Sequence, residues 1–174
     1  ASCILGAKLA GGEPSGTVPH AAILIMGDTV ELAKVYDAVV PSGEPRIVLV
    51  DTFKDEAEES LRVADALGAR LSGVRLDTPG ERGGVTVELV LEIRYRLDMA
   101  GFGHVQIVAS GGLNPDRIRL LSAAGAASFG VGSYISDAAP IDMTMDLKVI
   151  DGHPIAKRGR LPGVLASPRL LRVQ

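Results

Sequence analysis

The chain has 174 residues, of which 47% are apolar, and a net charge of −3, which fits one ordinary domain with a packed core. No basic stripe interleaves with aromatic residues, and no apolar run approaches the ~20 residues that cross a bilayer. The single cysteine, Cys3, excludes an internal disulfide framework and a multi-cysteine zinc site. We therefore expect a cytoplasmic protein without nucleic-acid or membrane partners and without a protein-built metal site.

The first third of the chain reads as helices separated by short turns. In chain order we expect the end of a helix over 2–10, a turn or short strand over 16–20, an apolar stretch over 21–26 and a helix from 28 to about 40. Asp28 and Glu31 have the spacing of a capping box, which marks the start of that last helix. Pro41-Ser42-Gly43 ends it.

Four short apolar runs, separated by helical patterns, follow in the middle of the chain. The expected strands are 46–51, 72–77, 104–109 and 127–131. The helix over 54–67 would carry Glu58 and Arg62 as an exposed i, i+4 pair, and the helix after the third strand has Asn114 as its N-cap and Pro115 at its first position. Strands that alternate with helices predict an α/β fold with a parallel barrel. A complete barrel takes ~250 residues, so we expect an incomplete one.

The pattern changes at about residue 143. Residues 143–150 alternate between apolar and polar, Asp151-Gly152 is a strong hairpin turn, and 154–157 returns. We therefore expect an antiparallel ribbon and a basic tail over 143–174, outside a barrel core over 1–142.

Glycine-rich segments follow the last two expected strands. They are Ser110-Gly111-Gly112 and Gly130-Val131-Gly132-Ser133. Glycine lets backbone N–H groups approach an anion closely, and the last two strand–helix loops of parallel barrels often bind phosphate. The alternative is a pair of tight turns that use glycine only for its geometry.

Charged residues occupy the other strand ends. Arg75 lies within an apolar strand, and alternation places it on the same side as Asp77. The pair either binds a ligand or forms an internal ion pair, because a buried charge needs a partner. Asp51 ends the preceding strand and either contacts ligand or caps the next helix. His20 follows a turn that contains Thr17. This spacing would allow both side chains to reach one pocket, but His20 could equally be a structural histidine.

Five segments together are similar to one enzyme family. They are Gly-Thr-Val-Pro-His-Ala at 16–21, Val-Asp-Thr-Phe at 50–53, Gly-Val-Arg-Leu-Asp-Thr-Pro at 73–79, Val-Ala-Ser-Gly-Gly-Leu at 108–113 and Phe-Gly-Val-Gly-Ser at 129–133. In this order and at this spacing they resemble nicotinate phosphoribosyltransferase, in particular its shorter-chain branch. The similarity covers roughly residues 1–163 and implies a barrel of the type II phosphoribosyltransferase kind without the family's N-terminal domain.

The resemblance implies an activity and assigns roles to residues. Such an enzyme joins nicotinate to the ribose of phosphoribosyl pyrophosphate with Mg²⁺, releases pyrophosphate, and makes nicotinate mononucleotide for NAD synthesis. Three catalytic positions are implied: His20, which would carry a phosphoryl group from ATP as a candidate co-substrate, and Asp51 and Asp77, near the ribose and pyrophosphate. The implied substrate-binding residues are Thr17 and Arg75 for nicotinate, and Ser110, Gly111, Gly112, Gly130, Gly132 and Ser133 for the 5′-phosphate. A homodimer or higher homo-oligomer is expected.

Two alternatives stay open beside this interpretation. A quinolinate phosphoribosyltransferase would need more cationic groups for its dicarboxylate, whereas a single strand arginine suits a monocarboxylate. A non-catalytic phosphate-binding barrel fragment is the second alternative, because an absent N-terminal domain would leave the site without residues that relatives supply from it. Pro19 and Ala21 replace the alanine and serine of many relatives around His20, which bears on the coupling to ATP.

Overall fold

The computed structural model describes residues 4–13, 16–164 and 166–167 of the chain, so Cys3 lies outside the described residues. The chain divides into two compact units, residues 1–138 and 139–174. No helix in the described part is both long enough and apolar enough to cross a membrane.

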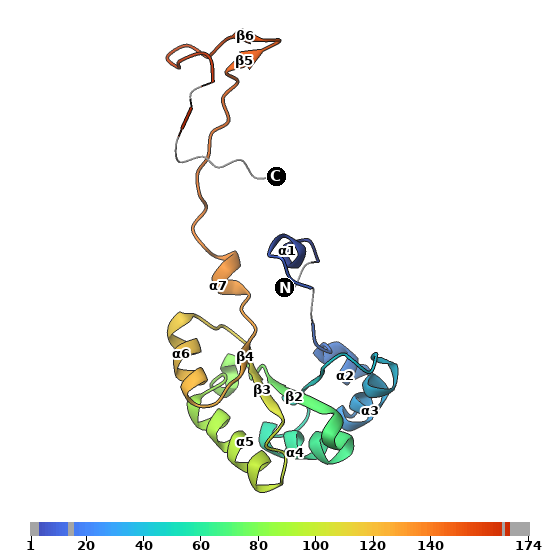
Figure 1. Ribbon diagram of the computed structural model, residues 1–174. Coiled ribbons are helices and arrows are strands. Elements are labelled where there is room, and N and C mark those ends of the chain that lie inside the picture. Colours follow the sequence, from blue (N-terminus) through green and yellow to red (C-terminus); the bar gives the residue numbers. More distant parts are fainter. Residues whose placement is uncertain (1–3, 14–15, 165, 168–174) are drawn as a thin grey trace. The chain divides into compact units, whose positions relative to one another are not determined.

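A four-stranded parallel sheet forms the centre of the first unit (Figure 1). Its strands lie in chain order: β1 (Arg46–Leu49), β2 (Leu71–Leu76), β3 (Gln106–Ala109) and β4 (Ser128–Phe129). All three neighbouring pairs are parallel, which confirms the expected α/β fold with an incomplete barrel. β2 has the expected six residues, whereas β1, β3 and β4 are shorter than expected, and β4 has two residues where the sequence predicts strand over 127–131.

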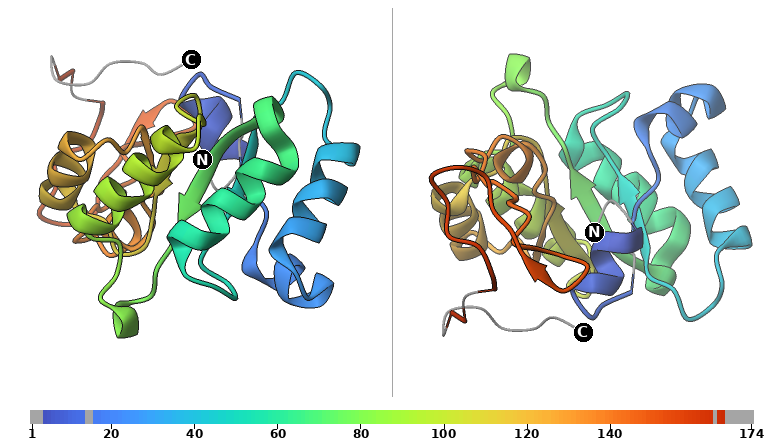
Figure 2. Two further views of the ribbon diagram at one scale, coloured as in Figure 1. Left: turned by 90° about the horizontal axis from the view of Figure 1, so that it is seen from below. Right: turned by 90° about the horizontal axis from the view of Figure 1, so that it is seen from above.

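The helices that connect the strands lie on one side of the sheet (Figures 1 and 2). The helices of the first unit are α1 (Ile4–Leu9), α2 (His20–Met26), α3 (Thr29–Val39), α4 (Glu56–Leu67), α5 (Val87–Met99), α6 (Pro115–Ala123) and α7 (Ser133–Ser136). Short 3-10 turns precede β2 (η1, Gly68–Arg70) and follow it (η2, Gly80–Arg82). Parallel strands need such helical connections, because the chain must cross from the carboxyl end of one strand back to the amino end of the next.

Side-chain caps explain where the helices start. Asp28 accepts the backbone N–H groups of Val30 at 2.8 Å and Glu31 at 3.1 Å, and Asn114 accepts that of Arg117 at 2.9 Å, as the sequence predicts. The expected Glu58–Arg62 pair is wrong. Two other acids compete successfully for Arg62, because they lie within reach at Glu59 (2.7 Å) and at Asp28 on the neighbouring helix (3.0 Å).

The two faces of the sheet differ in chemistry. The main apolar cluster beneath the helices includes Val48 of β1, Val74 and Leu76 of β2, and Ile107 and Ala109 of β3, together with Leu71 at the start of β2 and Val50 just after β1. Because side chains alternate along a strand, the residues between them point to the opposite face. That opposite face carries Arg75, and it is the inner side of a barrel.

The second unit contains a two-stranded antiparallel ribbon. Strand β5 (Val149–Ile150) pairs with β6 (His153–Pro154). Asp151 and Gly152 both have positive φ, 49° and 79°, which is the conformation of a two-residue type I′ hairpin turn. The expected turn and an antiparallel ribbon are confirmed, but each strand has only two residues, and residues 143–148 form no strand.

Candidate active site

The register of the sheet aligns four residues at its carboxyl edge. Leu49 pairs with Arg75, Arg75 with Val108, and Val108 with Ser128. Two residues further along each segment come Asp51, Asp77, Ser110 and Gly130. Since residues two apart point the same way, this row lies on the inner face directly above Arg75. The sheet thus brings together residues that are far apart in the chain: Asp51 and Gly130, the first and last of the row, are separated by 79 positions.

Arg75 connects the residues of this edge. Its Nε donates to Ser110 Oγ at 2.9 Å, one terminal nitrogen donates to Thr17 Oγ1 at 2.6 Å, and the other donates to Asp77 Oδ2 at 3.1 Å. The Arg75 side chain remains 27% exposed, and that of Asp77 22%. The guanidinium is therefore held in place by two hydroxyls and a carboxylate while part of it stays accessible to a ligand.

Ser110 links the same arginine to the same carboxylate. Its hydroxyl accepts from Arg75, and Asp77 Oδ1 and the carbonyl of Leu76 both lie 2.9 Å from it. A hydroxyl has one proton, so it donates to one of these two acceptors at a time. Both oxygens of Asp77 thus have a partner, which fixes the orientation of the carboxylate.

His20 and Asp51 form a second pair at this edge. The Nε2 atom of His20, the first residue of α2, lies 3.1 Å from each carboxylate oxygen of Asp51. The Asp51 side chain is 2% exposed and that of His20 is 39% exposed. A buried acid that engages Nε2 fixes the orientation of the imidazole, so that Nδ1 is the ring nitrogen directed away from Asp51.

The two glycine segments contribute to one cavity. It has a volume of about 470 Å³ and is lined by Gly112, Leu113, Asn114, Ser133, Tyr134, Asp137 and Ala138. Gly112 lies just before α6 and Ser133 begins α7. Of the six expected 5′-phosphate residues, these two line the cavity, whereas Gly130 packs against Ser110 at the strand edge.

The carboxylates of this edge suit a magnesium ion that a substrate brings. Mg²⁺ commonly binds through one or two carboxylates together with substrate phosphates. Asp77, which follows β2 and is 22% exposed, could supply such an oxygen. Asp51, which follows β1, is only 2% exposed and lies against His20, so it would have to turn outward to do the same. Within the described residues no group of three or more His, Cys, Asp or Glu side chains could hold a metal by itself.

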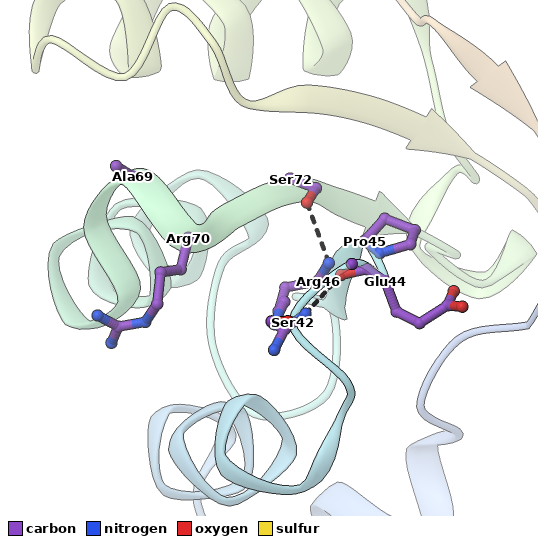
Figure 3. A pocket seen from close by; sticks show the side chains of 8 residues that line it. Ser42, Glu44, Pro45, Arg46, Ala69, Arg70 and Ser72 are labelled. Atoms are coloured by element: carbon purple, nitrogen blue, oxygen red, sulfur yellow. Dashed lines mark hydrogen bonds between the residues drawn. The ribbon is translucent and has the colours of Figure 1, made fainter.

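A second cavity, of about 460 Å³, lies at the opposite, amino end of β1 and β2 (Figure 3). Arg46 lines it, but all its side-chain nitrogens are used: they donate to Asp37 Oδ1 and to the carbonyls of Asp37, Val40, Pro41 and Glu44. Burial raises the pKa of Asp37, but hydrogen bonds from Arg46 and Arg70 outweigh this and lower it overall. These contacts hold the α3–β1 turn together and leave Arg46 no free donor.

Sequence reasoning missed several residues near the edge. Glu56 and Thr78 are buried and hydrogen-bonded to each other at 2.8 Å, and Tyr134 and Asp137 line the cavity beside the glycine segments. Thr78 could have been singled out because it directly follows Asp77. Glu56 looks like an ordinary acid in the first turn of a helix, so no signal distinguished it.

Comparison with known families agrees with this geometry. The family model described as "Quinolinate phosphoribosyl transferase, C-terminal domain" matches residues 12–146. The chain belongs to this family. The match spans the parallel sheet, both candidate catalytic acids and both glycine segments.

Individual members of the phosphoribosyltransferase group are also similar to the chain. It is 32% identical over 160 residues to nicotinate phosphoribosyltransferase pncB2 from two strains of Mycobacterium tuberculosis, a match of 87% of this chain and 33% of the relative. The crystal structure of nicotinate-nucleotide pyrophosphorylase from Pyrococcus furiosus superposes with a TM-score of 0.76 at 43% identity, over 94% of this chain and 42% of that one. The chain therefore spans about a third to two fifths of the length of these relatives.

Proposed function

We propose that this chain is the catalytic barrel core of a phosphoribosyltransferase of NAD biosynthesis that acts on nicotinate. The reaction joins the pyridine nitrogen of nicotinate to the anomeric carbon of phosphoribosyl pyrophosphate. The products are nicotinate mononucleotide and pyrophosphate. Membership in the phosphoribosyltransferase family supports the reaction class, and the arginine at the sheet edge supports the choice of substrate.

The observation that carries the substrate assignment is the environment of Arg75. A partly exposed guanidinium is a good partner for the carboxylate of a flat acid, because it can donate two parallel hydrogen bonds. Thr17 and Ser110 hold it from two sides, so little side-chain entropy would be lost on binding. Lys54 and Arg82 also lie near the strand ends and pair with Glu58 and Glu56. Arg75 differs from them because two hydroxyls hold it in addition to its acid, Asp77.

The chemistry proposed for this edge is a displacement at the anomeric carbon. The bond from carbon to the pyrophosphate oxygen breaks, pyrophosphate takes that electron pair, and the nitrogen lone pair forms the new bond. The transition state resembles an oxocarbenium ion, so it needs positioned anions near the ribose and charge neutralisation at the leaving group. Asp51 and Asp77 would orient the ribose and hold the Mg²⁺ that accompanies pyrophosphate. The cavity beside Gly112 and Ser133 would hold the 5′-phosphate.

We also propose that His20 couples the reaction to ATP. With Nε2 directed at Asp51, the Nδ1 lone pair could attack the γ-phosphorus of ATP, forming phosphohistidine and releasing ADP. Incubation with γ-labelled ATP should label the parent protein and fail to label H20A. H20A should keep slow basal synthesis without stimulation by ATP. If ATP neither labels nor stimulates the parent, His20 has no such role.

Quinolinate is the second candidate substrate. The family model that matches 135 residues, from 12 to 146, is named for it, so this alternative has direct support. Quinolinate has two carboxylates to bind. The sheet edge offers Arg75 for one of them, and the other would need a further cation. The two substrates therefore make different demands on one site.

Competition between substrates tests the proposal. We would measure kcat/KM for nicotinate, quinolinate and nicotinamide with phosphoribosyl pyrophosphate and Mg²⁺. Nicotinate should be preferred, and nicotinamide, which lacks the carboxylate, should be poor. Preference for quinolinate would replace the substrate assignment, whereas binding of phosphoribosyl pyrophosphate without turnover of any of the three compounds would favour a non-catalytic module. Light scattering of the same samples tests the proposed homo-oligomer.

A further inference from the structure

Glu56 is a buried carboxylate that the proposed chemistry does not use. It is the first residue of α4, and 1% of it is exposed. A carboxylate without partners would be costly at such a position. Its Oε1 accepts the hydroxyl of Thr78 at 2.8 Å and lies 3.3 Å from a terminal nitrogen of Arg82. The start of α4 also favours a negative charge there.

These contacts join two loops that carry the candidate catalytic acids. Asp51 lies in the loop that runs from β1 into α4, five residues before Glu56. Thr78 directly follows Asp77 in the loop between β2 and α5 and is 5% exposed. The Glu56–Thr78 hydrogen bond therefore spans the gap between the segment after β1 and the segment after β2.

The neighbourhood of Thr78 gives little room for movement. A Cβ atom at Gly111 would lie 3.1 Å from Asp77 Oδ1 and 3.8 Å from the Thr78 carbonyl, so the β3 loop already packs against this segment. A Cβ atom at Gly84 would lie 4.0 Å from the same carbonyl. A shift of Thr78 would thus be passed to Asp77 and to the first glycine segment.

We propose that Glu56 is a positioning residue that fixes the distance between Asp51 and Asp77 through its hydrogen bond to Thr78. Its part in catalysis rests on the proposed function, whereas its hold on the 77–85 loop does not. Glu56 contacts neither acid itself, so it acts through the backbone of the two loops. A displacement of about 1 Å in a catalytic group can cost about 100-fold in rate.

The chain offers a matched control for this proposal. Glu59, one turn further along α4, is also buried, with 0% exposed, and also pairs with an arginine, Arg62. E56M and E59M therefore remove a buried carboxylate from the same helix with a side chain of similar length. Of the two acids, Glu56 is the one hydrogen-bonded to residues of the 77–85 loop, whereas Glu59 is bonded to Arg62 of its own helix. T78V removes the hydroxyl from the other side, and T78S restores it.

Two measurements test the proposal. E56M and T78V should lower kcat for nucleotide synthesis by about 10- to 100-fold with a smaller change in nicotinate KM. T78S and E59M should stay close to the parent. Hydrogen exchange should accelerate over residues 77–85 in E56M and T78V and not in E59M.

The outcomes separate the two proposals. Equal loss of kcat in E56M and E59M, or unchanged exchange over 77–85 in E56M, would overturn the positioning role. If the parent forms no nucleotide while exchange over 77–85 still rises selectively, the proposed function fails and the link between the loops stands.

Discussion

Arg75 is the residue on which the proposed substrate assignment most depends. It reaches Thr17, 58 positions earlier, and Ser110, 35 positions later, and it lies beside Asp77. Such an arginine could serve only to hold the barrel together. Its partial exposure and its fixed fork favour binding of a carboxylate.

Replacing Arg75 separates binding from structure. R75A should raise the KM for nicotinate by about 10- to 100-fold, because a hydrogen bond to a charged group contributes about 1.5–3 kcal/mol. R75K keeps the charge but loses the planar fork, so it should fall between R75A and the parent. The affinity for phosphoribosyl pyrophosphate should change little in both. Steady-state kinetics with each substrate varied in turn provides the measurement, and an unchanged nicotinate KM in R75A would remove Arg75 from the site.

At the level of single residues, much of this edge could be predicted from the sequence. Alternation along one strand is enough to place Arg75 and Asp77 on one side, and the ion pair between them confirms it. The partnership of His20 with Asp51 could not be derived in this way, because it joins residues 31 positions apart. The same is true of Glu56 and Thr78. Contacts between segments depend on register and on helix placement, which local patterns do not contain.

The contact between β3 and β4 depends on a glycine. A Cβ atom at Gly130 would lie 3.0 Å from the Cβ of Ser110, closer than almost all real contacts, whereas one at Gly132 would meet nothing within 4 Å. Neither glycine has a positive φ, so the comparison isolates packing. G130A should lower the free energy of unfolding by about 1–3 kcal/mol through overpacking, and G132A by clearly less. Urea unfolding measures both, and equal losses would contradict this close approach.

The pairing of α3 with α4 predicts a dependence of stability on pH. The side-chain hydrogen bond from Arg62, together with the backbone N–H groups of Glu31 and Val30, lowers the pKa of Asp28 below its usual 3.8. A lowered folded-state pKa stabilises the protein above the unfolded value, and this stabilisation disappears as the pH falls through the folded-state pKa.

Two variants measure this contribution. D28A should lower the free energy of unfolding at neutral pH by about 1 kcal/mol, because the helix cap is lost. D28N keeps a capping oxygen without the charge, so the advantage of the parent over D28N should shrink as the pH is lowered from 5 to below 3.8. D116N, which removes the exposed Asp116–Arg119 pair, provides the control for a solvated ion pair. A parent–D28N difference that stays constant with pH would contradict the role of the charge.

Among the elements, the caps and strand order were predictable and the pairing of charges was not. Asp28 and Asn114 could be identified as N-caps from the sequence, because capping involves residues only two or three positions apart. The failure of the Glu58–Arg62 expectation has the opposite cause: Arg62 reaches Asp28 on a neighbouring helix, which one helix's pattern cannot reveal. The two-residue β4 likewise reflects pairing with β3 alone, since only Val108 and Ala109 have partners there.

For the whole molecule, the strand ends gather the proposed phosphoribosyltransferase site on an incomplete barrel. The carboxyl edge holds an arginine with two hydroxyls, two carboxylates and a cavity between glycine segments. The relatives are two to three times longer than the matched segment.

The most direct test is the stoichiometry of the products. Nicotinate, phosphoribosyl pyrophosphate and Mg²⁺ would be incubated with the protein, and nicotinate mononucleotide and pyrophosphate would be quantified together by chromatography. We predict one nicotinate mononucleotide for each pyrophosphate released. At nicotinate concentrations below the KM of the parent, R75A should form both products about 10- to 100-fold more slowly. Pyrophosphate release without nucleotide, or nucleotide formation that R75A leaves unchanged, would contradict the proposal.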